Sequence, residues 1–219
     1  SEAAISPPLQ GSHAVDVLIV GGGFVGLWTA MTLKQLEPDA RVTLVDRSET
    51  ISYGGCGIPY FVSGDVSEID ELRKTAFHML RDEAFFLHTK GVDVRTGTEC
   101  TAIHRAAKTV TLRHLASATE ETLAYDKLVL ATGAAPRRLG LPGENLPGVF
   151  RVHNLDGAQR IRAQVAAGGV ERAVVVGAGF VGLEMAVALA DMWGVEVTVA
   201  ERVPQILPGV TGPNLAAMA

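Results

Sequence analysis

The chain has 219 residues, of which 47% are hydrophobic and only 5% aromatic, and it contains 24 glycines. This composition fits an α/β protein with enough apolar sequence for more than one buried core. The formal net charge is −5 and no block of like charges occurs, so nothing indicates binding to nucleic acid or to an anionic membrane surface.

The chain begins with SEAAISPPLQGSHA, a segment of 14 residues rich in Ser, Pro and Gly that predicts a disordered lead-in. It lacks the charged and apolar regions of a signal peptide, and no apolar run reaches the length of about 18 residues that spans a membrane. We therefore expect a cytoplasmic protein with no membrane partner. The two cysteines form no paired framework and the six histidines show no metal-ligand spacing, so no disulfide scaffold and no metal site is predicted.

The first motif in chain order is VLIVGGGFVGL at residues 17–27, an apolar β-run that leads through G-x-G-x-x-G into a helical pattern. Gly21 permits the tight turn, Gly23 lets a pyrophosphate approach the backbone, and Gly26 lets the helix pack close to the strand. A phosphate would then bind at the helix N-terminus. The next β-run, RVTLVDR, ends near Asp46, at the distance of about 20 residues where a carboxylate accepts hydrogen bonds from a ribose. The sequence predicts a complete dinucleotide-binding βαβ unit.

A glycine-rich segment, ISYGGCGIPYFVSG at residues 51–64, follows and contains Cys56. Gly54, Gly55 and Gly57 leave space around the sulfur for a planar ring or a bulky thiol substrate. A short helix after Cys56 would place the thiol at a helix N-terminus, which lowers the pKa of a cysteine. The alternative is a small buried apolar cysteine, and the local sequence leaves both interpretations open. Cys100, in the alternating run ECTAIHR, is interpreted as such a packing residue.

The middle of the chain predicts elements of three kinds. Residues 68–90 are expected to form one or two amphipathic helices whose buried stripe is Met79, Leu80, Phe85 and Phe86. Short β-rich runs over residues 92–123 suggest a small antiparallel meander. YDKLVLATGAAPR then predicts a buried strand that ends at Thr132 and Gly133, and prolines and glycines at 142–148 mark the passage into a second unit at about residue 150.

The second motif, VVVGAGFVGLEMA at residues 174–186, repeats the first. Gly177, Gly179 and Gly182 take the three glycine positions, and the strand VEVTVAER carries Glu201 at the equivalent acidic position. A carboxylate repels a 2′-phosphate, so this copy favours NADH over NADPH, although Arg202 beside it weakens that inference. One such motif is weak evidence, whereas two complete copies in tandem are strong evidence.

The predicted fold class is therefore α/β, with two Rossmann-like parallel-sheet units and a small antiparallel β-meander. The expected domains are a lead-in at 1–14, a first unit at 15–149 and a second unit at 150–219. Because the sequence stops soon after the second strand of the second unit, we expect that unit to be truncated and its apolar strands to be poorly covered.

Taken together, GGGFVG with Asp46, ISYGGCGIPYFVSG, YDKLVLATGAAPR and GAGFVGLE with Glu201 resemble the flavoprotein pyridine nucleotide-disulfide oxidoreductase family. The resemblance implies that the first unit binds FAD and the second binds NAD(P)H. It implies FAD contacts from Gly21, Gly23, Gly26, Asp46, Arg47, Thr132 and Gly133, and NAD contacts from Gly177, Gly179, Gly182 and Glu201.

The same resemblance places Glu184 near the nicotinamide and the flavin, where it would support catalysis. The alternative is that Glu184 complements the helix dipole from the first turn. Tyr60 is either a hydroxyl near the thiol of Cys56 or a packing residue. Thr132 and Gly133 would either approach the flavin or only form the tight turn that ends their strand.

Members of this family with two redox cysteines have C-x-x-x-x-C, but Phe61 occupies the second position here. S-Y-G-G-C-G-I-P-Y is instead similar to the single-cysteine branch, which includes coenzyme A-disulfide reductases and persulfide reductases, with NADH oxidases and peroxidases as neighbours. Coenzyme A-disulfide reductases often have Asn just before the cysteine, whereas this chain has Gly55.

The resemblance thus implies an NADH-dependent flavoprotein that reduces a small-molecule disulfide or persulfide through Cys56. The implied cofactors are FAD and NADH rather than NADPH, together with coenzyme A where the substrate is coenzyme A disulfide. The full-length enzyme would be a homodimer. Three alternatives remain. The first is an NADH oxidase or peroxidase that uses a Cys56 sulfenic acid, the second is a ferredoxin-type reductase in which Cys56 is incidental, and the third is a nucleotide-binding module without turnover.

Overall fold

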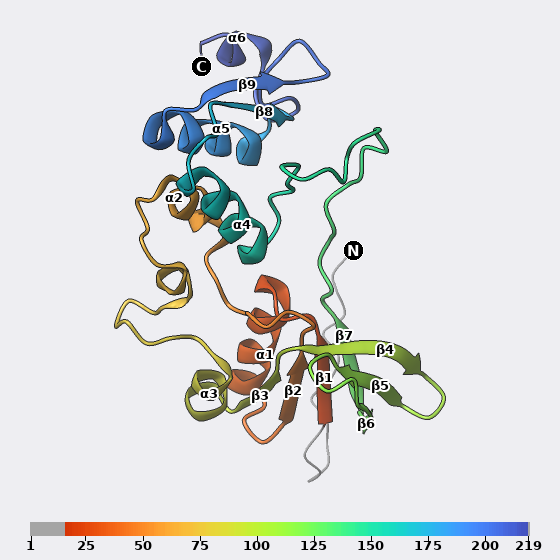
Figure 1. Cartoon of the computed structure of the whole chain (residues 1–219). Coiled ribbons are helices and arrows are strands. Elements are labelled where there is room, and N and C mark those ends of the chain that lie inside the picture. Colours follow the sequence, from red (N-terminus) through yellow and green to blue (C-terminus); the bar gives the residue numbers. More distant parts are fainter. Residues whose placement is uncertain (1–15, 219) are drawn as a thin grey trace. The chain divides into compact units, whose positions relative to one another are not determined.

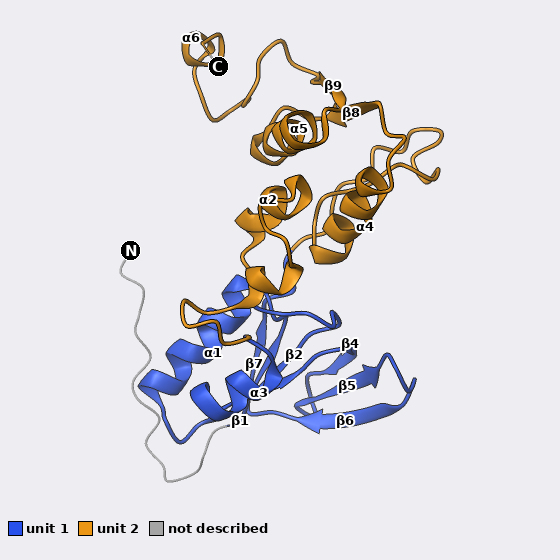
Figure 2. Ribbon diagram, turned by 60° about the vertical axis from the view of Figure 1, so that its left-hand side comes forward, with its two compact units in different colours: residues 1–52, 81–133 blue, residues 53–80, 134–219 orange. Residues whose placement is uncertain are grey.

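The computed structural model describes residues 16–218, so the lead-in expected at 1–14 lies outside the described residues. Contacts within the chain define two compact units, coloured separately in Figure 2. The first unit comprises residues up to 52 together with 81–133, and the second comprises 53–80 together with residues from 134 onward. Segments 53–80 and 134–149, expected in the first domain, thus have most of their contacts in the second unit. The boundaries of the two cofactor domains stay a prediction.

The first unit contains the predicted parallel sheet. Its strands are β1 (Asp16–Val20), β2 (Arg41–Val45), β3 (Val92–Arg95) and β7 (Lys127–Leu130), in the order β3-β2-β1-β7. Every neighbouring pair is parallel. Helix α1 (Phe24–Leu36) connects β1 to β2, as the first motif predicts.

Alternation along the strands sends side chains to two separate cores. On one face, Ile19 and Leu44 pack with Leu27 of α1. On the other face, Leu18 and Val45 pack with residues of the meander. The sheet is therefore covered by a helix on one side and by strands on the other (Figure 2).

The antiparallel meander consists of β4 (Thr98–His104), β5 (Thr109–His114) and β6 (Glu120–Ala124), with a bulge between Cys100 and Ala102. The expectation that the meander begins at residue 92 is wrong, because β3 is the outer strand of the parallel sheet. The reason lies in packing: Val92 and Val94 are buried in the same core as Phe86. A short strand with two apolar positions does not reveal from its sequence which sheet it joins.

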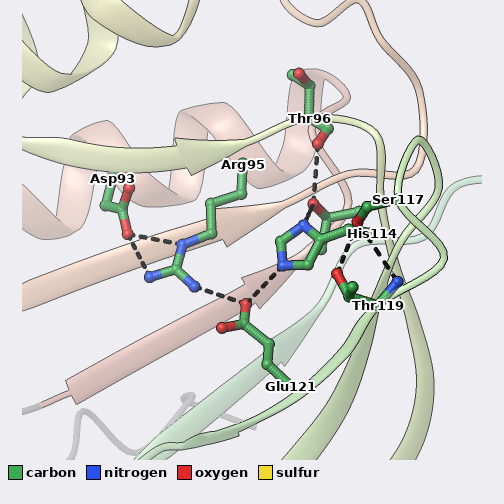
Figure 3. A network of polar contacts seen from close by, with 8 residues as sticks. Asp93, Arg95, Thr96, His114, Ser117, Thr119 and Glu121 are labelled. Carbon is green, nitrogen blue, oxygen red and sulfur yellow. Dashed lines mark hydrogen bonds and ion pairs between the residues drawn. The ribbon is translucent and has the colours of Figure 1, made fainter.

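A polar network joins the end of β3 to the meander (Figure 3). The guanidinium of Arg95 donates to Asp93 (Nε–Oδ2 3.0 Å) and to Glu121 of β6 (NH1–Oε1 3.0 Å). The same Glu121 oxygen lies 3.2 Å from Nε2 of His114, whose Nδ1 lies 3.3 Å from the buried hydroxyl of Thr98. This network fixes the meander against the parallel sheet.

The segment 68–90 differs from the expected amphipathic helices. It forms short turns of helix, η2 (Ile69–Arg73), α3 (Glu83–Phe85) and the π-turn η3 (Phe86–Lys90). Between them the chain folds back, because the hydroxyl of Thr75 accepts hydrogen bonds from the backbone N–H groups of Phe77 and Met79. Met79 is exposed, so its expected burial is wrong, whereas Phe86 is buried as expected.

The second unit contains η1 (Gly55–Gly57), α2 (Ile58–Ser63), α4 (Leu155–Ala166), β8 (Arg172–Val176), α5 (Phe180–Trp193), β9 (Glu196–Ala200) and α6 (Pro213–Ala216) (Figure 1). Strands β8 and β9 are parallel and form a sheet of two strands. Val174 and Val176 are 68% and 65% exposed, which confirms the expectation of poorly covered apolar strands. Across residues 16–218, no helix has both the length and the apolar character needed to cross a bilayer.

The first core makes a direct prediction for stability. Leu44 is fully buried in β2, and Leu44→Ala is expected to lower the free energy of unfolding by about 2–5 kcal/mol, because it removes apolar contacts and leaves a cavity. Leu36→Ala is the matched control, since Leu36 is 74% exposed, and should change it by less than about 0.5 kcal/mol. Urea unfolding measures both values, and equal losses would contradict the assigned core.

Candidate functional site

The turn after β1 has the geometry of a tight dinucleotide-binding turn. Gly21 has a φ of +117°, in the left-handed region, and a Cβ added there would lie 2.1 Å from the carbonyl oxygen of Ala131. A Cβ at Gly26 would lie 1.8 Å from the carbonyl oxygen of Gly21. Both contacts are with backbone, so only glycine fits at either position. The backbone N–H of Gly21 donates to Val45 of β2 (2.8 Å) and fixes the turn to the sheet.

The turn after β8 repeats this geometry closely. Gly177 has a φ of +105°, and its N–H donates to Ala200 of β9 (2.8 Å). A Cβ at Gly182 would lie 2.0 Å from the carbonyl oxygen of Gly177. One difference concerns the neighbouring strand: a Cβ at Gly177 meets nothing within 4 Å, whereas Gly21 has β7 beside it. The two sequence motifs therefore fold into the same turn, with fewer neighbours at the second.

Both helices that follow these turns present open N-termini. Gly23 is the N-cap of α1 and Gly179 is the N-cap of α5, and within the described chain neither helix has a side-chain cap. A Cβ at either glycine would meet nothing within 4 Å. Backbone N–H groups at a helix N-terminus with free space before them suit a phosphate. This fits the role that the sequence predicts for the middle glycine of each motif.

Asp46 follows β2 directly and contacts the first turn. Its Oδ2 accepts the N–H of Gly22 (2.5 Å) and its Oδ1 accepts the N–H of Ser48 (2.7 Å). Sequence reasoning missed the contact with Gly22, because it assigned the carboxylate only to a ribose. A carboxylate accepts about four hydrogen bonds, so Asp46 keeps acceptor capacity for ribose hydroxyls while it holds the turn.

Glu201 makes the equivalent contact in the second unit. Its Oε2 accepts the N–H of Ala178 (2.9 Å), and its Oε1 accepts the N–H groups of Arg202 (2.7 Å) and Val203 (3.2 Å). The hydrogen bond from Ala178 is the main cause that lowers the pKa of Glu201, with the bond from Val203 next. Glu201 thus stays ionised, and its negative charge disfavours a 2′-phosphate nearby.

Cys56 lies in η1, directly before α2, and is exposed. Its turn is fixed by the N–H of Gly54, which donates to the carbonyl of Leu72 (2.8 Å), and by the N–H of Gly57, which donates to Gly54 (2.9 Å). A Cβ at Gly55 would meet nothing within 4 Å, whereas one at Gly57 would lie 2.3 Å from Cδ2 of Leu72. Of the two glycines beside the cysteine, Gly55 therefore borders open space and Gly57 borders Leu72. Leu72 lies in the segment expected to form amphipathic helices, but it is not among the residues expected to be buried there.

The remaining candidates are distributed between the two units. Thr132 and Gly133 follow β7, and the backbone nitrogen of Thr132 would lie 3.1 Å from a Cβ at Gly21, so Thr132 borders the first turn. Arg47 and Tyr60 are exposed. Glu184 is the fifth residue of α5 and lies beyond its first turn, so the interpretation that it complements the dipole from the first turn is wrong.

The second cysteine differs from the first. Cys100 lies in β4, half-buried against the core of the meander, and burial raises the pKa of its thiol. This environment disfavours the reactive thiolate form. Among the residues that the structure describes, no group of three or more His, Cys, Asp or Glu side chains is arranged to hold a metal ion.

These features define a protein with two dinucleotide turns and one exposed cysteine. The family of pyridine nucleotide-disulphide oxidoreductases matches residues 15–219, and the chain belongs to it.

Three similar proteins support this family membership. A curated NADH oxidase of Methanocaldococcus jannaschii is 32% identical over 91% of this chain and 43% of its own length. A Pyrococcus horikoshii protein named NAD(P)H coenzyme A polysulfide/persulfide reductase is 33% identical over 87% of this chain and 40% of its own length. The solved structure of an NAD-dependent persulfide reductase from A. fulgidus is 39% identical, with a TM-score of 0.88 over 93% of this chain and 37% of that one. The chain thus spans less than half the length of these relatives.

At the second turn, alanine substitutions at two glycines should have different effects, one on stability and the other on NADH affinity. Gly182→Ala should lower the free energy of unfolding by about 1–3 kcal/mol, because its Cβ meets the backbone of Gly177. Gly179→Ala should lower the free energy of unfolding by less than about 1 kcal/mol, because space is open there and only the N-cap preference for glycine is lost. It should nevertheless weaken NADH binding about tenfold or more by filling the approach to the helix N-terminus. Thermal unfolding and NADH titration separate the two effects. Unchanged NADH affinity in Gly179→Ala would contradict the assignment.

The lowered pKa of Glu201 predicts a dependence of stability on pH. The ionised carboxylate stabilises the fold above its usual pKa of 4.5, and this stability is lost as the pH falls through the lowered value in the folded state. Glu201→Gln should therefore be less stable than wild type at neutral pH, and the difference should disappear in acid. Urea unfolding from about pH 7 to about pH 3 measures this. Glu196→Gln, at the other end of β9, is the control, and a difference that persists in acid would contradict the explanation.

Proposed function

We propose that the protein is an NADH-dependent flavoprotein that reduces a small-molecule disulfide or persulfide, with Cys56 as its redox-active sulfur. The observation that carries this proposal is the exposed thiol of Cys56 in a chain with two dinucleotide turns of matching geometry. The relatives named persulfide reductase support it.

The first unit is proposed to hold FAD. Gly21 and Gly26 form the tight turn, and the open N-terminus of α1 at Gly23 suits the pyrophosphate. Asp46 has free acceptor capacity for the adenosine ribose. The remaining contacts are assigned by family resemblance to Arg47, Thr132 and Gly133.

The second unit is proposed to hold NADH. Gly177 and Gly182 form its turn, and the N-terminus of α5 at Gly179 is open in the same way. Glu201 is held by three backbone N–H groups and disfavours NADPH by its charge. Glu184 is assigned a supporting role near the nicotinamide, and Tyr60 a supporting role near the thiol.

The chemistry proposed for Cys56 is thiol–disulfide exchange. Its thiolate attacks one sulfur of the substrate, a mixed disulfide forms, and the other half of the substrate leaves as a thiolate. A pair of electrons from NADH then cleaves the mixed disulfide and releases the second half, so one NADH, one proton and one disulfide give NAD⁺ and two thiols. When bound, the flavin supplies the passage of electrons from nicotinamide to sulfur. Open space beside Gly55 suits a bulky substrate, of which coenzyme A disulfide is one candidate.

A second candidate function is the reduction of oxygen or peroxide, favoured by the relative named NADH oxidase. In this case the Cys56 thiolate attacks one oxygen of hydrogen peroxide, the O–O bond breaks, and hydroxide leaves, so the cysteine becomes a sulfenic acid. Two electrons from NADH with two protons then return the sulfenic acid to the thiol and release water. From family membership we also propose that the full-length protein is a cytoplasmic homodimer.

The two functions and their dependence on sulfur are tested by Cys56→Ser in the full-length, FAD-loaded protein. Anaerobic turnover of NADH with coenzyme A disulfide should fall to below about 1% of wild type, because serine cannot form the mixed disulfide. Reduction of the flavin by NADH should stay within about twofold of wild type, since it does not need sulfur.

Cys100→Ser is the matched control and should retain full turnover. Equal turnover in wild type and Cys56→Ser would contradict sulfur-mediated transfer and favour a ferredoxin-type reductase. Turnover with peroxide or oxygen, but not with disulfides, would favour the oxidase or peroxidase.

A further inference from the structure

The helix that follows Cys56 is short but packs against both long helices of the second unit. Helix α2 has only six residues, too few to be stable alone. Its buried side chains Ile58, Phe61 and Val62 share one core with residues of α4 and α5, which include Ile161 and Leu189. The position of α2 is therefore set by these two helices.

Trp193, the last residue of α5, makes a directed contact with the end of α2. Its indole Nε1–H donates to the carbonyl oxygen of Val62 at 2.7 Å. The last four carbonyls of a helix have no partner within the helix, so this indole supplies one of the partners that α2 needs. The carbonyl oxygen of Tyr60, two residues earlier, accepts hydrogen bonds from the N–H groups of Gly64 and Val66.

Arg162 of α4 holds the same end of α2 from another side. Its guanidinium lies 4.4 Å from the ring centroid of Phe61, a distance at which a cation is attracted to an aromatic face. It also donates to the carbonyl of Val66 at 2.8 Å. A hydrogen bond from Trp193 thus holds the C-terminal end of α2, one from Arg162 holds the chain just after it, and a third, from Gly54 to Leu72, holds the chain before Cys56.

We propose that Trp193 is a positioning residue for Cys56. Cys56 lies in η1, which runs directly into α2, and a helix is stiff along its axis, so the contact at Val62 constrains the position of the cysteine. Helix α5 carries the second dinucleotide turn at its N-terminus and Trp193 at its C-terminus. It therefore holds the cysteine segment and the nucleotide turn in one fixed frame. This inference rests on the proposed function only in taking Cys56 as the reacting sulfur.

The test is Trp193→Phe in the full-length, FAD-loaded protein, which keeps an aromatic ring but removes the N–H donor. The rate of alkylation of Cys56 by iodoacetamide, measured by mass spectrometry across a pH series, should change about threefold or more at its plateau, as expected for loss of one part-buried hydrogen bond. Turnover with the disulfide should fall about fivefold in kcat, with the KM for NADH within about twofold of wild type.

Two controls separate positioning from general loosening. Trp28→Phe makes the same chemical change at the other tryptophan of the chain, in the first unit, and should leave Cys56 alkylation unchanged. Cys100, in the first unit, is an internal reference in the same sample for unfolding of the whole chain, which would raise its alkylation as well. Loosening of the second unit would instead raise the KM for NADH, which Trp193→Phe is expected to leave within about twofold. Arg162→Lys serves as the second variant if Trp193→Phe does not fold, and it should change Cys56 alkylation in the same way.

Cys56 alkylation within about twofold of wild type in the variants that fold would overturn the proposal, as would a change shared equally by Cys100. The alkylation readout does not depend on turnover. If Cys56→Ser retains disulfide turnover, the proposed function fails, while a selective change in Cys56 alkylation still supports the positioning role of Trp193.

Discussion

The close approach of a helix to a strand through a glycine is the constraint on which both units depend. At Gly26 and again at Gly182, the space for a side chain is occupied by the carbonyl oxygen of the first glycine of the motif. Any Cβ would push the helix away from the sheet. The helix N-terminus would then no longer lie over the strand end, and the acidic residue of the next strand would lose its backbone partner in the turn. Fold and candidate site thus depend on the same contact.

Features that depend on local stereochemistry could be predicted from the sequence. The two βαβ turns, the strand before each, and the positions of Asp46 and Glu201 follow from glycine positions and apolar runs, because all of them lie within one βαβ unit of regular geometry. The family membership predicted from these motifs is confirmed by the match over residues 15–219. The individual cofactor contacts stay predictions.

Features that depend on distant partners could not be predicted. The strand at Val92 joins the parallel sheet because it pairs with β2 and its valines share a core with Ile19 and Leu44. Leu72 fills the space beside Gly57, and Trp193 reaches Val62 from more than a hundred residues away in the chain. No periodicity in the sequence records such contacts, since they are made only after the chain has folded.

The division into two units has a consequence for how this polypeptide is synthesised and dissected. The chain passes from one unit to the other after residues 52, 80 and 133, so neither unit is a single continuous stretch. Strands β1 and β2 must wait on the ribosome until β3 and β7 have emerged before the four-stranded sheet can close. Cleavage at a single peptide bond therefore cannot release either unit intact. The shortest fragment that contains the whole first unit also contains residues 53–80, with Cys56.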